Sequence, residues 1–231
     1  MSTYSFPDCV RIMPRPHDLL WVADAAGLWS DCPLPSWATP DWLAGAPLVM
    51  RRERVSDPDC IPVGLRGRTR SQRHQAYMSR QAVVKCVAPE LLAAGQAWSG
   101  PHQLGTFPAL DALASLAPSL TATGLPWGPT GSIGFALASS LPVLRAESDL
   151  DLVVRAFKPL TAEQTALLLA LRSSSICKID LQIDTGHGAF SLAEWASGHR
   201  RVLLKTDTGP FLTDDPWRRS DWNPTESVSP S

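Results

Sequence analysis

Polar and apolar residues alternate along two stretches in the second half of the chain. In the first, Asp149 and Asp151 flank Leu150, and residues 152–154 are all apolar. In the second, residues 178–184 alternate between polar and apolar side chains. Successive side chains of a strand point to opposite faces, so each stretch predicts a strand with one buried face. The two carboxylates of the first strand then lie side by side on its other face.

Weaker patterns predict short strands before these two and helices around them. Prolines punctuate the first third of the chain and limit the length of its elements. Strands are expected over 19–22, 46–50, 60–64, 202–205 and 210–212, the last two as a terminal hairpin. Helices are expected over 71–79, 89–98, 107–116 and 161–172, the last opened by a capping box at 161–164, and a second capping box is expected at 191–194.

These elements predict an α+β protein in two parts. Residues 1–98 form a small N-terminal lobe of short strands and a helix, which we expect to bind a substrate or partner. The segment Ser99–Gln103 breaks the chain. Residues 99–222 form a domain with a mixed sheet and flanking helices, and residues 223–231 are a polar, proline-broken tail expected to be disordered.

The paired aspartates indicate a metal site. Two carboxylates held close together repel each other unless a cation neutralises them, and Mg²⁺ binds through one or two carboxylates plus substrate phosphates. Asp180, on the later strand, is the third candidate ligand, whereas Asp184 is expected to cap a turn. Upstream, Gly131 and Ser132 form a turn suited to phosphate oxygens. The alternative is a polar strand edge that faces water.

Positive charge is concentrated between Arg51 and Lys85, a segment that contains nine basic residues and only three acidic ones. Arginine predominates, and its guanidinium group matches phosphate oxygens bidentately. The spacing after Gly67 resembles a loop entering a helix, where an anion would also meet exposed N–H groups. The phosphate-binding candidates are Arg66, Arg68, Arg70 and Arg73. A solvated surface is the alternative.

Composition favours a soluble enzyme. The 231 residues are 44% hydrophobic and 19% charged, and the net charge of −1 argues against general nucleic-acid binding. The chain contains no apolar run typical of a secretory signal or a membrane span, so we expect a cytoplasmic protein. The five cysteines and five histidines are scattered without zinc spacing.

The order of a Gly-Ser pair, an Asp-x-Asp strand and a third aspartate resembles the nucleotidyltransferase superfamily of the DNA polymerase β type, although the sixteen residues between Ser132 and Asp149 exceed its usual spacer. Further segments make the resemblance more specific. They are similar to the malonate decarboxylase holo-acyl-carrier-protein synthases, a family of phosphoribosyl-dephospho-CoA transferases. The segments are Arg15–Trp21, Val63–Arg73, Trp127–Ala138, Ser148–Leu152 and Leu203–Pro210.

The resemblance implies a polymerase-β-like catalytic domain and a defined reaction. The phosphoribosyl-dephospho-CoA group of triphosphoribosyl-dephospho-CoA passes to a serine of the apo acyl carrier protein of malonate decarboxylase, and pyrophosphate leaves. Asp149, Asp151 and Asp180 then hold Mg²⁺ and catalyse the transfer, Gly131 and Ser132 bind the triphosphate, and Lys178 is a further substrate contact.

Two other functions remain open at this point. One is a nucleotidyltransferase that uses ATP to modify a protein or small molecule, and the mass added to the acceptor would distinguish it. The other is a carrier-binding module without catalysis, which would require no metal. The roles of His17 and Asp18 are also open.

Overall fold

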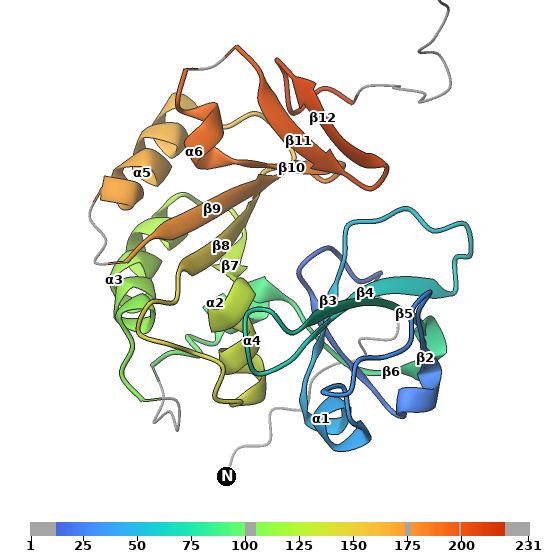
Figure 1. Cartoon of the computed structure of the whole chain (residues 1–231). Helices are drawn as coiled ribbons and strands as arrows, with labels where there is room; N and C mark the ends of the chain where they lie inside the picture. The colour runs from blue at the N-terminus through green and yellow to red at the C-terminus, as the bar shows by residue number, and fades with distance from the viewer. Residues whose placement is uncertain (1–12, 100–104, 174–176, 199, 220–231) are drawn as a thin grey trace, which may run out of the picture.

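The chain folds around two six-stranded sheets in the computed structural model, which describes residues 13–99, 105–173, 177–198 and 200–219. The first sheet is built from the N-terminal third of the chain and the second from the remainder (Figure 1). Helices flank both sheets. The α+β class predicted from the sequence, with a strand-rich N-terminal part followed by a mixed sheet, is confirmed.

The first sheet is antiparallel throughout, with the order β2-β5-β4-β3-β1-β6. It contains the three strands predicted in this region and adds β2, β5 and β6. Its strands are β1 (Leu19–Val22), β2 (Leu28–Trp29), β3 (Leu48–Met50), β4 (Cys60–Arg66), β5 (Arg73–Ser79) and β6 (Val83–Val87). Helix α1 (Pro40–Gly45) precedes β3, and the short 3₁₀ turns η2 (Ala25–Gly27) and η3 (Arg80–Ala82) connect strands.

The second sheet has the order β12-β11-β10-β9-β8-β7, and only its pair β8–β9 is parallel. Its strands are β7 (Trp127–Pro129), β8 (Leu150–Arg155), β9 (Ile179–Asp184), β10 (Gly188–Ser191), β11 (Val202–Thr206) and β12 (Gly209–Thr213). The helices around it are α2 (Pro89–Ala94), α3 (Pro108–Ala122), α4 (Gly131–Ser139), α5 (Ala162–Ser173) and α6 (Leu192–Trp195).

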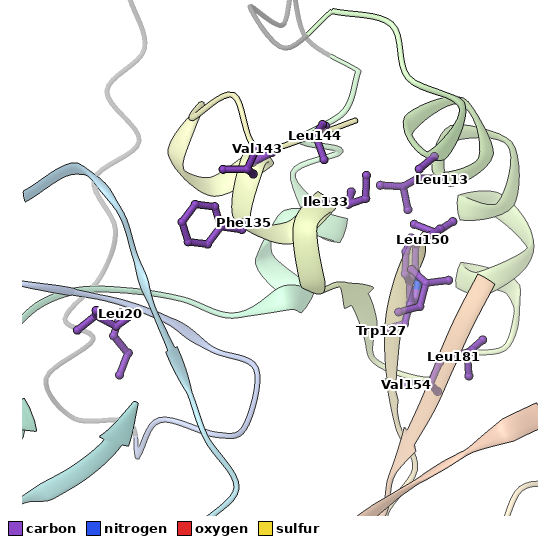
Figure 2. Close-up of a cluster of buried hydrophobic side chains, with 14 of the residues drawn as sticks. Leu20, Leu113, Trp127, Ile133, Phe135, Val143, Leu144, Leu150, Val154 and Leu181 are labelled. Carbon is purple, nitrogen blue, oxygen red and sulfur yellow. The ribbon is translucent and has the colours of Figure 1, made fainter. Parts of the chain in front are cut away.

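Strand β8 is held in place by apolar contacts on its inward face. Leu150 and Leu152 are buried, as the alternation predicts. Figure 2 shows Leu150 near Leu113 of α3 and Ile133 of α4, two side chains that are fully buried. Because these helices cover the apolar side of β8, its polar side is left to face the first sheet.

The prediction of a helix over 71–79 is wrong, because residues 73–79 form strand β5. Side chains there alternate: Ala76 and Met78 are fully buried, whereas Arg73 and Gln75 are exposed. The preceding residues do not enter a helix either. They make the turn of the β4–β5 hairpin, in which Gly67 N–H donates to the carbonyl of Gln72 at 2.9 Å.

The capping boxes have opposite outcomes. The capping box predicted at 161–164 is confirmed. The backbone N–H of Gln164 donates to Thr161 Oγ1 (3.1 Å), and the backbone N–H of Thr161 donates to Gln164 Oε1 (3.0 Å). The one predicted at 191–194 is wrong. Ser191 makes no capping hydrogen bond, and Glu194 instead accepts from the N–H of Leu203 at 2.9 Å.

The remaining expectations concern element lengths. The terminal hairpin is confirmed as β11–β12. The helix expected from residue 89 begins there but ends at Ala94, and the one expected over 107–116 continues to Ala122. The tail 223–231 lies outside the described residues. Within the described ranges, no helix has the length and apolar character needed to cross a membrane.

Candidate active site

The predicted carboxylates gather where the parallel strands β8 and β9 begin. Asp149 directly precedes β8, and Asp151 is its second residue. Asp151 is the register partner of Asp180 on β9. The three carboxylates therefore come from two adjacent, parallel segments, which places Asp180 near Asp149 and Asp151 as expected from the sequence.

Burial and the neighbouring carboxylates both disfavour the charged form of Asp151. Burial, followed by the charges of Asp180 and Asp149, raises the pKa of Asp151 to about 6, although Arg66 and Arg73 act in the opposite direction. A carboxylate that resists ionisation because it is buried and has acidic neighbours is stabilised by a nearby cation.

Helix α4 starts against the same carboxylate. Gly131 is its first residue and has a φ of +55°, a conformation that glycine adopts without steric cost. A Cβ atom at Gly131 would lie 1.8 Å from Oδ2 of Asp151, so no larger residue fits. Gly131 and Ser132 thus begin a helix instead of forming the predicted isolated turn. The N-terminus of this helix offers unpaired N–H groups beside Asp151.

A cleft of about 1460 Å³ lies between the two sheets, and most of the predicted site residues line it. The residues that line it include Gly131, Ser132, Asp149, Asp151, Arg66, Arg70 and Arg73. Typical small-molecule pockets measure about 300–1,000 Å³, so this cleft has room for a larger substrate.

The arginines reach the cleft from the β4–β5 hairpin. The guanidinium group of Arg66 lies over the ring of Phe135 at 5.4 Å, which places the first sheet against α4. Burial, with a contribution from Arg73, lowers the pKa of Arg66 to about 10. Arg68 differs from the others, because its guanidinium group lies over Trp42 at 5.0 Å and does not line the cleft.

Two further predicted residues lie at the edge of the group. Lys178 is mostly exposed and its Nζ is 3.5 Å from Asp149 Oδ2, so it neutralises part of the carboxylate charge. Asp180 adjoins Asp151 in the sheet, but neither Asp180 nor Lys178 is among the residues that line the cleft.

The residues fit a magnesium ion bound jointly by protein and substrate. No three His, Cys, Asp or Glu side chains in the described ranges form a ready-made metal cluster. Asp149 and Asp151 nevertheless supply hard oxygen ligands at the cleft wall, and Mg²⁺ commonly takes its other ligands from water and substrate phosphates. The raised pKa of Asp151 is a separate sign that this position favours a cation.

Sequence reasoning missed a buried ionic network at the other end of β8. Arg155, only 1% exposed, donates to Glu90 Oε1 at 3.0 Å, Asp184 Oδ2 at 2.5 Å and the carbonyl of Pro16 at 2.9 Å. Arg52 donates to the same oxygen of Asp184 at 2.7 Å. The network joins the two sheets. The one feature of the sequence that could have indicated this network is the charged residue Arg155 directly after the apolar run 152–154.

Asp184 therefore has more than the capping role predicted for it. Its Oδ1 does accept the N–H of Gly186 at 2.7 Å, which caps a turn. Burial alone would raise the pKa of Asp184, but the charges of Arg52 and Arg155 outweigh that effect and lower it.

His17 and Asp18 lie beside this network. Asp18 is buried and accepts the N–H of Arg15 at 2.8 Å. His17 lines the cleft with a φ of 78°, which is unusual for a residue other than glycine. Burial and the positive charges of Arg155 and Arg52 lower its pKa to about 4, so His17 is neutral near pH 7.

Comparison with known proteins gives a consistent result across nearly the whole chain. Residues 15–89 match the family model of the phosphoribosyl-dephospho-CoA transferase MdcG N-terminal domain, and residues 99–216 match that of the C-terminal domain. No solved structure shows significant similarity to the chain.

Curated relatives agree with the family models. A phosphoribosyl-dephospho-CoA transferase of Pseudomonas putida (strain GB-1) is 46% identical over 204 residues, which cover 88% of this chain and 95% of the relative. Proteins of the same name from Azotobacter vinelandii and Klebsiella pneumoniae are 43% and 40% identical, each over 90% of this chain and 96% and 98% of their own lengths. The chain is therefore an enzyme that belongs to the MdcG family of phosphoribosyl-dephospho-CoA transferases.

Proposed function

We propose that this transferase attaches the phosphoribosyl-dephospho-CoA prosthetic group to a serine of the apo acyl carrier protein of malonate decarboxylase. The donor is triphosphoribosyl-dephospho-CoA, and pyrophosphate is the second product. The observation that carries the proposal is the contact between Asp151 and Gly131, since it brings a carboxylate that favours a cation against a helix N-terminus that favours phosphate.

The size of the cleft supports a large donor. Its walls come from both sheets and from the β11–β12 hairpin, which contributes Lys205 to Pro210. A phosphoribosyl-dephospho-CoA group is much longer than a single nucleotide, and a carrier serine must reach its reactive phosphate. A cleft larger than ordinary small-molecule pockets can accept both.

Each group of side chains has a distinct task in this proposal. Asp149 and Asp151, with Asp180 beside them, would hold Mg²⁺. The bound ion would supply electrostatic stabilisation to the charge that develops on the phosphate oxygens during transfer. The first N–H groups of α4 and the hydroxyl of Ser132 orient the triphosphate. Arg66, Arg70 and Arg73 contact its oxygens from the opposite wall.

The bond changes balance without any additional reactant. The serine oxygen of the carrier forms a bond to the phosphorus nearest the ribose, and the bond from that phosphorus to the terminal pyrophosphate breaks. Asp180, which adjoins Asp151 at the edge of the cleft, would help to position the attacking hydroxyl group and would accept its proton. Phosphoryl-type transfer depends mainly on alignment and electrostatics, which is what rigid strands on one side and an arginine hairpin on the other provide.

Purified protein incubated with the apo carrier, Mg²⁺ and each candidate donor tests the proposal. With triphosphoribosyl-dephospho-CoA, the carrier should gain the mass of one phosphoribosyl-dephospho-CoA group on a serine, and a carrier with that serine replaced by alanine should gain nothing. A gain of one adenylate mass with ATP, and none with the larger donor, would contradict the proposal.

A further inference from the structure

A second polar row crosses the same face of the second sheet as the carboxylates. Strand register joins Arg155 to Asp184, Asp184 to Ala189, and Ala189 to Lys205. Arg155 is four residues after Asp151, so the two side chains share a face and their positions are roughly 13 Å apart along β8. Of this row, Ala189 and Lys205 line the cleft, whereas Arg155 is buried and does not. We call the part of the cleft at Asp149 and Asp151 its acidic end and the part at Lys205 its basic end.

The positive charges in and around this row are paired with carboxylates, except that of Lys205. Three arginines, Arg15, Arg52 and Arg155, pair with three carboxylates, Asp18, Glu90 and Asp184. Lys205 lines the cleft and is exposed, and no carboxylate of the described residues forms an ion pair with it. One positive charge in this part of the cleft is thus available to a ligand.

The surroundings of Lys205 suit an anionic ligand. His17 lies close enough for the charge of Lys205 to contribute to its lowered pKa, and it stays neutral and able to exchange hydrogen bonds near pH 7. Ala189, the neighbour of Lys205 in the register, has a small side chain and also lines the cleft. The segments Arg15–Trp21 and Leu203–Pro210, which had no role assigned from the sequence, both contribute to the lining of the cleft here.

We propose that Lys205, with His17 beside it, binds the diphosphate of the dephospho-CoA half of the donor. The inference rests on the proposed function. In that donor two ribose rings separate the reactive triphosphate from the diphosphate, so two anionic groups must be bound some distance apart. The acidic end with its metal and arginines takes the first, and Lys205 at the basic end takes the second.

Dephospho-CoA itself is the right probe, because it carries the diphosphate and lacks the triphosphate. Its dissociation constant can be measured by calorimetry with wild-type protein and with Lys205→Met, which keeps the length and apolar stem of the side chain. We expect binding to weaken about tenfold, as for the loss of one charge-assisted hydrogen bond at a partly exposed site. Lys205→Arg should restore binding to within about twofold.

Two matched variants make the result specific. Lys158→Met removes an exposed lysine that does not line the cleft, and it should bind dephospho-CoA like the wild type. Arg73→Gln alters the triphosphate end, so it should weaken the complete donor but leave dephospho-CoA binding unchanged. Wild-type affinity for dephospho-CoA in Lys205→Met, or a loss in Arg73→Gln alone, would overturn the assignment.

Turnover separates this inference from the proposed function. If both hold, Lys205→Met raises KM for the donor about tenfold and leaves kcat nearly unchanged, because Lys205 is remote from the reacting phosphate. Transfer with a wild-type KM in this variant would refute the Lys205 site and keep the proposed function. If the wild type modifies no carrier but Lys205→Met still binds dephospho-CoA tenfold more weakly than the wild type, the proposed function is refuted and the Lys205 site is kept.

Discussion

Replacement of Asp151 by asparagine should stabilise the folded protein when no metal is present. A carboxyl group with a pKa of about 6 instead of the ordinary 3.8 costs the folded state about 3 kcal/mol once it is ionised. Because Asp151 keeps some contact with solvent, we expect a gain of about 1–3 kcal/mol. The substitution removes no hydrogen bond between the carboxylate and another described residue.

The expected gain depends on pH in a defined direction. The pKa of Asp151 is raised in the folded state, so the folded protein binds more protons than the unfolded chain between about pH 4 and pH 6. Wild-type stability therefore falls as the pH rises through this window. The advantage of Asp151→Asn should be absent below about pH 4, grow across the window and stay constant above about pH 7.

Urea unfolding in the presence of EDTA, followed by circular dichroism at several pH values, measures this difference. Asp149→Asn is the matched control, since Asp149 already interacts with Lys178, and its effect should stay within about 0.5 kcal/mol. A destabilised Asp151→Asn at about pH 7.5, or a difference that does not change with pH, would refute the reasoning about carboxylate repulsion.

Three other variants and one control test the surroundings of the site. Gly131→Ala should cost about 1–3 kcal/mol in urea unfolding and lower kcat at least tenfold, because the added Cβ meets a carboxylate and the φ is positive. Arg70→Ala combined with Arg73→Ala should raise KM for the donor, more steeply at high salt, whereas Arg68→Ala should leave KM unchanged. Arg155→Met should lower the unfolding free energy by about 3–5 kcal/mol, because its buried carboxylate partners lose their cation. Wild-type stability and kcat in Gly131→Ala, a wild-type KM in the Arg70 and Arg73 double variant, or wild-type stability in Arg155→Met would contradict the corresponding assignment, as would a raised KM in Arg68→Ala.

Local patterns predicted strands β8 and β9 well. The alternation around Asp149 and Asp151 identifies the buried and polar faces of β8, since apolar residues on one side leave few other arrangements. The capping box at 161–164 was equally readable, because both of its hydrogen bonds form within four residues. In these places the physical cause is local, and the sequence contains all of it.

Interactions between residues far apart in the sequence determine the features that local patterns did not predict. Residues 73–79 contain good helix formers, but β4 pairs with them along their whole length and makes them a strand. The network around Arg155 joins residues that lie up to 139 positions apart, and no spacing rule predicts such a meeting. Arg68 and Arg70 are equivalent in the sequence pattern, yet the hairpin turn directs only Arg70 into the cleft.

Transfer by two carboxylate variants tests whether Asp149 and Asp151 hold Mg²⁺ for the reaction. Wild-type protein, Asp149→Asn and Asp151→Asn are each incubated with the apo carrier and triphosphoribosyl-dephospho-CoA, with and without Mg²⁺, and both the carrier mass and the released pyrophosphate are measured. We expect Mg²⁺-dependent transfer by the wild type, with one pyrophosphate released per modified carrier, and loss of most transfer in both folded variants. Wild-type rates in either variant would contradict this expectation.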